Sequence, residues 1–397
     1  MNPHTQHLDS LSPFTKALQN LATQNNTRSL QSYTHQGIFV RDTHNQLLIN
    51  LASNDYLGLQ TLWQDTIATF LQNASKDIAY LSASSSRLLS GDFPIFSQLE
   101  SYIANLYGKD CLLFNSGYHA NVGMIQSLAK LGKVLFVLDE YVHASVFDGI
   151  SLARAHFKRF AHNDIQALQK LVTHYHNDYD MLIIVAEGLY SMDGDFVPLH
   201  ELVRIKKCYE NVYIYLDEAH SIGVCGDDGL GKAKELHLSQ EIDFLILTFG
   251  KAISSVGACV VCHSQIKQYC INTARSLIYS TALPPINVAF SLQVFTALAQ
   301  LAPYRTHLRA LSTELISNLN TQRYEVLGQA HILGIVVGSN ERTLALAAHL
   351  RKYGIFAPAI RYPSVPKDTA RVRICLNAAL QFSHIHQLLE SLHKAEI

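Results

Sequence analysis

Short apolar runs that recur along residues 100–265 constrain the fold of this chain more than any other sequence feature. Helical patterns such as DIQALQKLVTHYH (164–176) and PLHELVRIKKCYE (198–210) separate several of them. Strands that are apolar on both sides have to be covered on both faces, and parallel neighbours need helical crossovers. We therefore predict an α/β fold with a mainly parallel sheet. Its expected strands are CLLFNS (111–116), KVLFVLD (133–139), HFKRFA (156–161), MLIIVAEG (181–188), VYIYLDEA (212–219), FLILTFG (244–250) and ACVVCH (258–263).

Outside this stretch the pattern changes. The first 50 residues are polar and irregular, with one short extended piece, GIFVRD. Two long helical patterns follow the apolar runs, and the alternation of strand and helix restarts near residue 332. A length of 397 residues suits two domains. We predict an N-terminal segment (1–54) that joins a small α+β domain (291–397), and a large α/β domain (55–290) between them.

The composition excludes several classes of protein. The 31 Lys and Arg residues balance 32 Asp and Glu residues, which argues against nucleic-acid binding. No apolar run reaches the ~18 residues of a membrane span, and no signal-peptide pattern opens the chain. Seven scattered cysteines fit a reducing cytoplasm better than a disulfide framework. Charged residues make up only 16% of the chain, so we expect another subunit to cover part of the surface.

Reactive side chains follow several of the expected strands. Ligands of open α/β sheets bind beyond the carboxyl ends of the strands. Asp217 and Lys251 each follow such a strand, as do the turn at 115–118 and His143. Any one of these residues, taken alone, is common in the turns that follow strands. Together, a Schiff-base lysine and an aspartate for a pyridinium nitrogen are what pyridoxal phosphate requires. Its phosphate could bind the helix N-terminus at 116–118, with the Thr248 hydroxyl as a further donor.

Other patterns compete with this interpretation and are weaker. Residues 259–263, CVVCH, match the haem-attachment motif, but they lie within an apolar run, which indicates a buried strand. His174 and His176 are two residues apart on a helical pattern and so face different ways. The glycines at 223–231 lack the order of a dinucleotide-binding loop. We predict no metal site.

Seven motifs spread over nearly the whole chain carry a family resemblance. They are LASNDYLGL (51–59), SRLLSGD (86–92), NSGYHAN (115–121), EGLYSMDGD (187–195), LDEAHSIGVCGDDGLG (216–231), TFGKA (248–252) and YSTALPP (279–285). By these motifs the chain resembles the α-oxoamine synthases, which are fold-type I pyridoxal-phosphate enzymes. The resemblance implies a large domain with a mainly parallel sheet, a smaller C-terminal domain, and a homodimer with the active site at its interface.

The resemblance also implies roles for the residues that match the family's motifs. Lys251 would bind the cofactor as an imine and later move the substrate's α-proton. Asp217 would pair with the ring nitrogen, and His143 would stack on the ring. The remaining cofactor contacts would be Ser191 and His220 near the phenolic oxygen, Ser116, Gly117, Tyr118 and Thr248 at the phosphate, and Ser280 and Thr281, which would reach the phosphate across the dimer interface.

The implied substrates are an amino acid and an acyl thioester. Asn54 and Arg361 would hold the amino-acid carboxylate, and Arg28 would lie at the acyl-chain entrance. The segments RFAHND (159–164) and AIRYPSVPKDTARVRI (359–374) are similar to the branch that condenses L-alanine with a pimeloyl thioester, carried by CoA or by acyl carrier protein.

Two alternatives stay open. A sister synthase, such as glycine C-acetyltransferase or an autoinducer-type synthase, would use another amino acid or acyl donor. A non-catalytic scaffold subunit should lack the lysine, which is present here. Ser254 and Phe96 depart from the residues usual in relatives, and so does the pair Leu88–Leu89.

Overall fold

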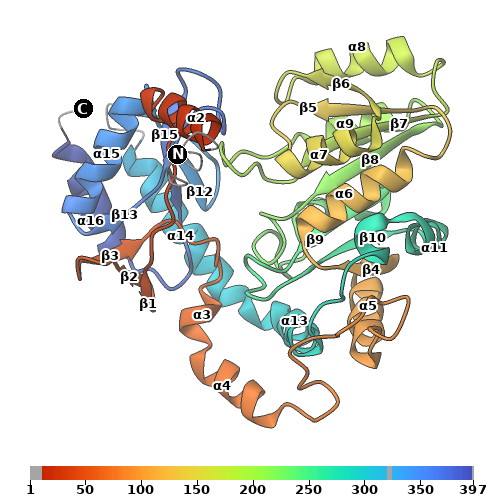
Figure 1. The fold of residues 1–397 in the computed structure, drawn as a ribbon, viewed down its shortest axis with the longest axis horizontal. Coiled ribbons are helices and arrows are strands. Elements are labelled where there is room, and N and C mark those ends of the chain that lie inside the picture. The colour runs from red at the N-terminus through yellow and green to blue at the C-terminus, as the bar shows by residue number, and fades with distance from the viewer. Residues whose placement is uncertain (1–10, 320–323, 396–397) are drawn as a thin grey trace, which may run out of the picture.

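The computed structural model describes residues 11–319 and 324–395, and within them a seven-stranded sheet forms the largest layer (Figure 1). Its strand order is β4-β10-β9-β8-β7-β5-β6. β10 runs antiparallel to both of its neighbours, and the pairings of β5, β6, β7, β8 and β9 are parallel. The prediction of a mainly parallel sheet is therefore confirmed. The strands are β4 (Asp110–Phe114), β5 (Val134–Asp139), β6 (His156–Phe160), β7 (Met181–Glu187), β8 (Val212–Asp217), β9 (Phe244–Thr248) and β10 (Ala258–Cys262).

Helices cover both faces of this sheet. Leu135 and Val137 of β5 join one buried apolar cluster, and Phe136 and Leu138 join the other, because side chains alternate along a strand. Helices α5 (Pro94–Tyr107), α8 (Ile165–Tyr175) and α9 (Leu199–Lys206) pack into the first cluster. Helices α6 (Gly117–Leu128), α7 (Ala144–Ala153), α11 (Ser264–Thr273) and α12 (Arg275–Ile278) pack into the second. The short helices α10 (Lys232–Glu235) and η1 (Ser239–Glu241) lie between β8 and β9 in the chain.

Both ends of the chain contribute to two smaller sheets. One has the order β1-β2-β3-β13 and the other β11-β12-β15-β14. Ile49 of β3 pairs in parallel with Ile355 of β13, which ties the N-terminal segment to the last third of the chain. Figure 1 shows the red N-terminal strands beside the blue C-terminal elements. The bounds are β1 (Thr34–Gln36), β2 (Phe39–Arg41), β3 (Leu47–Asn50), β11 (Glu325–Leu327), β12 (Ile332–Gly338), β13 (Ile355–Phe356), β14 (Ala359–Ile360), β15 (Ala370–Cys375), α15 (Asn340–Lys352) and α16 (Phe382–His393).

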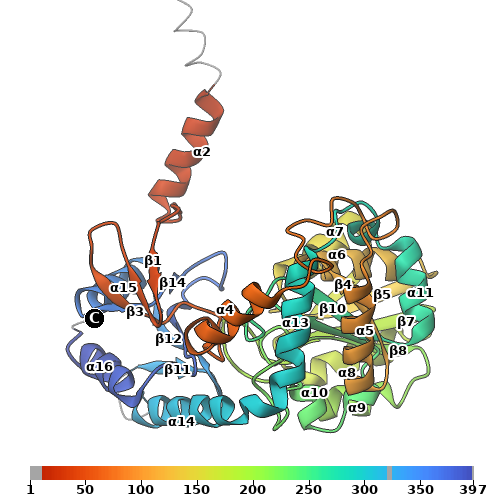
Figure 2. The same cartoon turned by 90° about the horizontal axis from the view of Figure 1, so that it is seen from below.

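The N-terminal segment also contains a helix, α2 (Ser12–Thr23), where the sequence pattern predicted irregular structure. That prediction was wrong because the surrounding Asn, Gln and Thr residues hide a helical stripe. Phe14, Leu18 and Leu21 lie on one side of α2 and are all exposed. In Figure 2 this helix projects away from the rest of the protein. Helices α3 (Leu59–Leu62) and α4 (Gln64–Asn73) follow β3.

A long helical run connects the large sheet with the smaller ones. It consists of α13 (Pro285–Ala297), η2 (Leu298–Leu301) and α14 (Ala302–Leu319) (Figure 2). By length and composition the run Pro285–Leu319 is apolar enough to cross a membrane. Half of its most apolar stretch is buried inside the protein, however, and the core helix of a soluble protein passes the same test.

Candidate active site

A cavity of about 460 Å³ opens at the carboxyl ends of β7, β8 and β9. Ligands of α/β sheets bind at this edge. Residues that the sequence analysis singled out supply more than half of its lining. They are Asn54, Ser116, Gly117, Tyr118, His143, Asp217, His220, Thr248 and Lys251.

Asp217 ends β8 and is held by two donors. Its Oδ2 accepts a hydrogen bond from Asn121 Nδ2 at 2.9 Å, and its Oδ1 accepts one from the backbone N–H of Ala219 at 2.9 Å. The Tyr215 hydroxyl donates to Asn121 Oδ1 at 2.7 Å and so fixes which end of the amide faces Asp217. These contacts hold a buried carboxylate at the wall of the cavity. Asn121 belongs to the NSGYHAN motif, but the sequence analysis gave it no role.

Lys251 lies in the turn after β9, with its Nζ 2.9 Å from His220 Nε2. Burial lowers the pKa of Lys251 to about 8, although the carboxylates of Asp217 and Glu187 favour the ammonium form. A lysine with a lowered pKa is more often a neutral amine, which can attack a carbonyl or accept a proton. The structure therefore places a reactive amine beside a buried carboxylate.

His143 precedes α7 and caps it. Its Nδ1 accepts a hydrogen bond from the backbone N–H of Ser145 at 3.2 Å and lies 2.8 Å from Ser145 Oγ. Burial lowers the pKa of His143, against the attraction of Asp217, so the ring is neutral at pH 7. With Nδ1 accepting, Nε2 carries the ring proton. The ring is thus fixed at the cavity wall, where it can stack on a flat ligand and donate one hydrogen bond.

The start of α6 is capped by Ser116 and opens onto the cavity. Ser116 caps the helix by accepting a hydrogen bond from the backbone N–H of His119 at 3.2 Å. A Cβ atom on Gly117 would lie only 2.6 Å from Thr248 Cγ2, so this position requires glycine. The close approach brings the first helical N–H groups next to the Thr248 side chain. Free N–H groups at a helix N-terminus bind phosphate.

Ser254, one of the departures from the family pattern, has a structural explanation. Its backbone φ is +55°, in the left-handed region that favours glycine. The Ser254 hydroxyl donates a 2.6 Å hydrogen bond to Asp55 Oδ1, and this bond offsets part of the backbone strain. The serine therefore preserves the turn that carries Lys251.

Five predicted site residues do not line the cavity. The Arg28 guanidinium donates to Ser364 Oγ at 3.2 Å, and Arg361 donates to the backbone carbonyl of Asn25. The backbone carbonyl of Thr281 accepts from the Asn115 amide at 2.6 Å, and Ser280 precedes it in the chain. The backbone carbonyl of Ser191 accepts a hydrogen bond from Arg373 Nε at 2.7 Å. Their proposed roles stay predictions.

The structure instead brings Arg373 of β15 next to Asn54. Arg373 Nη1 donates to Asn54 Oδ1 at 3.3 Å, and its side chain is buried. A sequence signal existed, because Arg371 and Arg373 alternate within an apolar strand, and a buried arginine requires partners. Two further polar residues were also missed. Glu187 lines the cavity, and Tyr56 lies behind it, hydrogen-bonded to Asn54.

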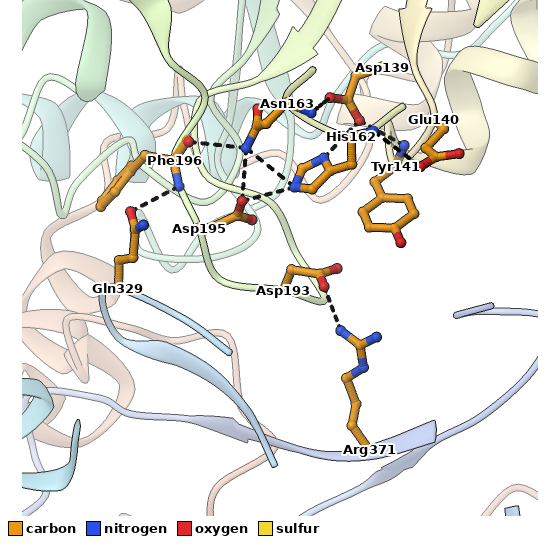
Figure 3. A network of polar contacts seen from close by, with 10 residues as sticks. All are labelled: Asp139, Glu140, Tyr141, His162, Asn163, Asp193, Asp195, Phe196, Gln329 and Arg371. Carbon is orange, nitrogen blue, oxygen red and sulfur yellow. Dashed lines mark hydrogen bonds and ion pairs between the residues drawn. The ribbon is translucent and has the colours of Figure 1, made fainter. Parts of the chain in front are cut away.

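A network of charged side chains supports the loop that contains Ser191 (Figure 3). His162 Nδ1 lies 2.9 Å from Asp139 Oδ1, and His162 Nε2 lies 2.9 Å from Asp195 Oδ2. These two carboxylates raise the pKa of His162 to about 10, against the opposing effect of burial. In the same loop, Asp193 forms a 2.6 Å ion pair with Arg371 of β15. The loop is thus held from both the large sheet and a smaller sheet.

This network predicts a pH-dependent stability. The pKa of His162 in the folded protein lies above its unfolded value, near 6.5. Its stabilising effect is therefore complete below pH ~6.5 and is lost as the pH rises through about 10. We expect His162→Ala to lower the free energy of unfolding by about 3 kcal/mol at pH 6, and by less near pH 10. Urea unfolding at both pH values measures this, with exposed His174→Ala as the control. An equal loss at both pH values would contradict a charged His162.

Comparison with known proteins identifies relatives of this site. The profile of the family described as aminotransferase class I and II matches residues 47–392. A protein of Glaesserella parasuis serovar 5, which carries the provisional name 8-amino-7-oxononanoate synthase, is 44% identical over 96% of this chain and 100% of its own.

Two solved structures agree with these relatives. A serine palmitoyltransferase from S. paucimobilis, with a bound aldimine of pyridoxal phosphate and myriocin, has a TM-score of 0.86 and 26% identity, covering 97% of this chain and 96% of its own. The 8-amino-7-oxononanoate synthase of Francisella tularensis has a TM-score of 0.75 and 26% identity, covering 87% of this chain and 97% of its own. The prediction of a fold-type I transferase is confirmed.

The cavity fits pyridoxal phosphate. Lys251 would supply the amine for an imine, Asp217 would supply a carboxylate for the ring nitrogen, and Gly117 would open a phosphate-binding turn. In addition, the buried Oε1 of Glu187 has no hydrogen-bond partner within the described residues, as expected where a polar group binds. The chain therefore belongs to the aminotransferase class I and II family, within the group of acyltransferases related to 8-amino-7-oxononanoate synthase.

Proposed function

We propose that the protein condenses L-alanine with a pimeloyl thioester to give 8-amino-7-oxononanoate, CO2 and the free carrier, a step of biotin biosynthesis. Pyridoxal phosphate is the cofactor, as predicted. The observation that carries the proposal is a single cavity that combines the Lys251 amine with the Asp217 carboxylate. The 44% identity to the Glaesserella parasuis protein supports the choice of substrates. We propose the cytoplasm as its location.

The difficult step is removal of the α-proton of L-alanine. Bound pyridoxal phosphate supplies an electron sink for the negative charge that this step leaves on carbon. Lys251, whose pKa is lowered to about 8, acts as the base that takes the proton. Asp217 favours a protonated ring nitrogen, because a buried carboxylate stabilises a nearby positive charge. His143 presents its Nε2–H toward the thioester oxygen when that carbonyl is attacked.

The amino-acid carboxylate requires a cation. Arg373 fits this role because its buried guanidinium already contacts Asn54, which lines the cavity. A guanidinium can bind both oxygens of a carboxylate in a fork. Arg361 stays a second candidate on the basis of the family resemblance. Arg28 is proposed for the acyl entrance, where it contacts Ser364.

We further propose a homodimer that completes the site. Leu81 and Leu89 are 85% and 82% exposed, and Tyr279 is 71% exposed. The two segments that carry these side chains lie against each other, because the backbone N–H of Ala282 donates to the Ser85 carbonyl at 2.9 Å, and we propose that they form one surface. Burying such a leucine contributes roughly 1.5–3 kcal/mol. Ser280 and Thr281 belong to the same surface and are proposed to reach the partner's phosphate.

The double variant Leu81→Glu, Leu89→Glu is expected to be monomeric and at least about tenfold less active, because it places charges in the proposed interface. Size-exclusion chromatography with light scattering measures the mass, and a condensation assay measures the activity. Leu344→Glu on α15, outside this surface, is the matched control and should stay dimeric. A wild-type protein that is monomeric and fully active would contradict the proposal.

The choice of substrates is tested by product formation with a panel of amino acids. We expect kcat/KM for L-alanine to exceed that for glycine, L-serine and 2-aminobutyrate by at least about tenfold. The structural similarity to serine palmitoyltransferase favours a sister synthase as the second candidate. A preference for L-serine with a long acyl chain would support that alternative. Parallel rates with pimeloyl-CoA and pimeloyl acyl carrier protein identify the carrier.

A further inference from the structure

A chain of three hydrogen bonds runs from Lys251 through the buried residues His220 and Tyr56 to Asn54, which also lines the cavity. Lys251 Nζ lies 2.9 Å from His220 Nε2, and His220 Nδ1 lies 2.6 Å from the Tyr56 hydroxyl. The same hydroxyl donates to Asn54 Oδ1 at 3.0 Å. Tyr56 is fully buried and His220 is 5% exposed, so bulk water does not compete for these contacts. Tyr56 lies in the LASNDYLGL motif, and neither the sequence analysis nor the proposed mechanism gives it a role.

The Tyr56 hydroxyl has only one proton to donate. When that proton points to Asn54 Oδ1, the phenol oxygen accepts from Nδ1–H of His220, and Nε2 is left to accept from Lys251. When it points to His220 Nδ1 instead, Nε2 carries the ring proton and donates toward Lys251. Burial lowers the pKa of His220 well below its ordinary value, so the ring is neutral and carries a single proton. The position of that proton is therefore linked to the Tyr56 hydroxyl.

We propose that Tyr56 is a positioning residue, whose hydroxyl decides whether the His220 nitrogen beside Lys251 donates or accepts a hydrogen bond. The inference rests on the proposed function, because Lys251 is the amine that binds the cofactor there. An imine, a free amine and an ammonium group at this place differ in what they donate and accept. Because a neutral His220 can change its tautomer, its Nε2 can either donate a hydrogen bond to Lys251 or accept one from it. It can therefore pair with all three forms of the Lys251 nitrogen without carrying a charge.

The Tyr56 ring is held independently of these hydrogen bonds. It packs against His331, with ring centroids 4.1 Å apart and an interplanar angle of 59°. His331 is 1% exposed, and neither of its ring nitrogens has a hydrogen-bond partner among the residues described. It therefore acts on Tyr56 by packing alone. A cavity of about 270 Å³ beside His331 gives room for a slightly larger ring. His331→Phe is accordingly a matched control that keeps the packing and leaves the hydrogen-bond chain intact.

Removal of the hydroxyl changes none of the charges around Lys251. The titratable groups that affect Lys251 or share its hydrogen bond are Asp217, Glu187, His143, His220, Arg373 and Cys375. Tyr56→Phe retains all of them, together with the buried ring. The Tyr56 hydroxyl also hydrogen-bonds the Arg373 guanidinium, which stays charged in Tyr56→Phe, so a shift in the titration of the Lys251 imine reports on the hydrogen-bond chain only if it disappears in a His220→Asn background.

The experiment uses the holoenzyme and follows the visible absorbance of the bound cofactor against pH. We expect Tyr56→Phe to shift the midpoint by at least about 0.5 pH unit, since a second hydrogen-bond partner tunes the basicity of a histidine. We also expect kcat to fall about 10- to 100-fold, with KM for L-alanine within about threefold of the wild type. His331→Phe should leave both the midpoint and kcat near the wild-type values. Thermal melting of each variant checks that it is folded.

A double mutant tests whether Tyr56 acts through His220. In a His220→Asn background, Tyr56→Phe should change kcat by less than about twofold, because the two residues act as one unit. An unshifted midpoint for Tyr56→Phe would overturn the proposal. So would a raised KM for L-alanine alone, which would mean that Tyr56 acts through Asn54 or Arg373, both of which it contacts. The titration needs only bound cofactor, so a wild type that titrates normally but makes no 8-amino-7-oxononanoate would refute the proposed function and not the role of Tyr56.

Discussion

Lys251→Ala should lose activity by a factor on the order of 10⁴, a larger loss than we expect from any other single substitution in the cavity. Under the proposed mechanism, the variant loses both the amine that links to the cofactor and the base that removes the α-proton. In the wild type, Lys251 Nζ contacts His220 and lies in the same cavity as Asp217. No other lysine lines that cavity within the described residues. Product formation from L-alanine and pimeloyl-CoA measures the loss.

Covalent labelling separates this role from a structural one. Borohydride reduction followed by peptide mapping should place the cofactor on Lys251 in the wild type and on no residue in the variant. Lys170→Ala on the exposed side of α8 is the control and should keep wild-type activity and labelling. A Lys251→Ala variant within tenfold of the wild type would falsify the assignment.

Asp217→Asn is the second large effect, and we expect kcat to fall about 10³-fold with little change in stability. Asparagine has the same shape and can still accept from the Ala219 N–H, so folding should be preserved. It carries no charge, however, and no longer favours a protonated ring nitrogen. Steady-state kinetics and thermal melting of the same preparation measure the two quantities together.

Asn121 bears on how this result is interpreted, because its Nδ2 donates to Asp217 Oδ2. In Asp217→Asn the one carbonyl oxygen stays on the Ala219 N–H, so the new NH2 group faces Asn121 Nδ2 and that donor loses its acceptor. Asp178→Asn, on an exposed loop, controls for the chemical change itself. Activity of Asp217→Asn within about tenfold, a barrier change of only ~1.4 kcal/mol, would exclude the proposed role.

The core of the fold was predictable because burial on both faces leaves an unmistakable pattern. Apart from the edge strand β6, the strands of the large sheet correspond to apolar runs, and Asp217 ends β8 while Lys251 comes three residues after β9. Since the carboxyl ends of parallel strands meet at one edge, their proximity followed from the sequence. The turn at Gly117 could be predicted in the same way, because it follows the apolar run of β4.

What the sequence concealed depends on contacts between distant segments. Arg373 lies in β15, and it reaches Asn54 because the segment after β3 runs beside β15, where the Cys375 N–H donates to the Leu51 carbonyl at 2.9 Å. Arg361, twelve positions earlier, fitted the same chemical requirement, and nothing local distinguished the two. Helix α2 was missed because its apolar stripe has no partner within the described residues. Sequence periodicity reveals which face of a single helix or strand is buried. It reveals neither a contact between two distant segments, such as Arg373 with Asn54, nor a helix such as α2, whose apolar side is exposed.

The pairing of β3 with β13 has a consequence for synthesis on the ribosome. The large sheet is complete once residue 262 has emerged, whereas β3 has to wait for residue 355 before its neighbour exists. Asn54, just after β3, meets Arg373 later still. A nascent polypeptide can therefore assemble the sheet edge that carries Asp217 and Lys251 first, and a chain that ends before β15 lacks the Asn54–Arg373 contact.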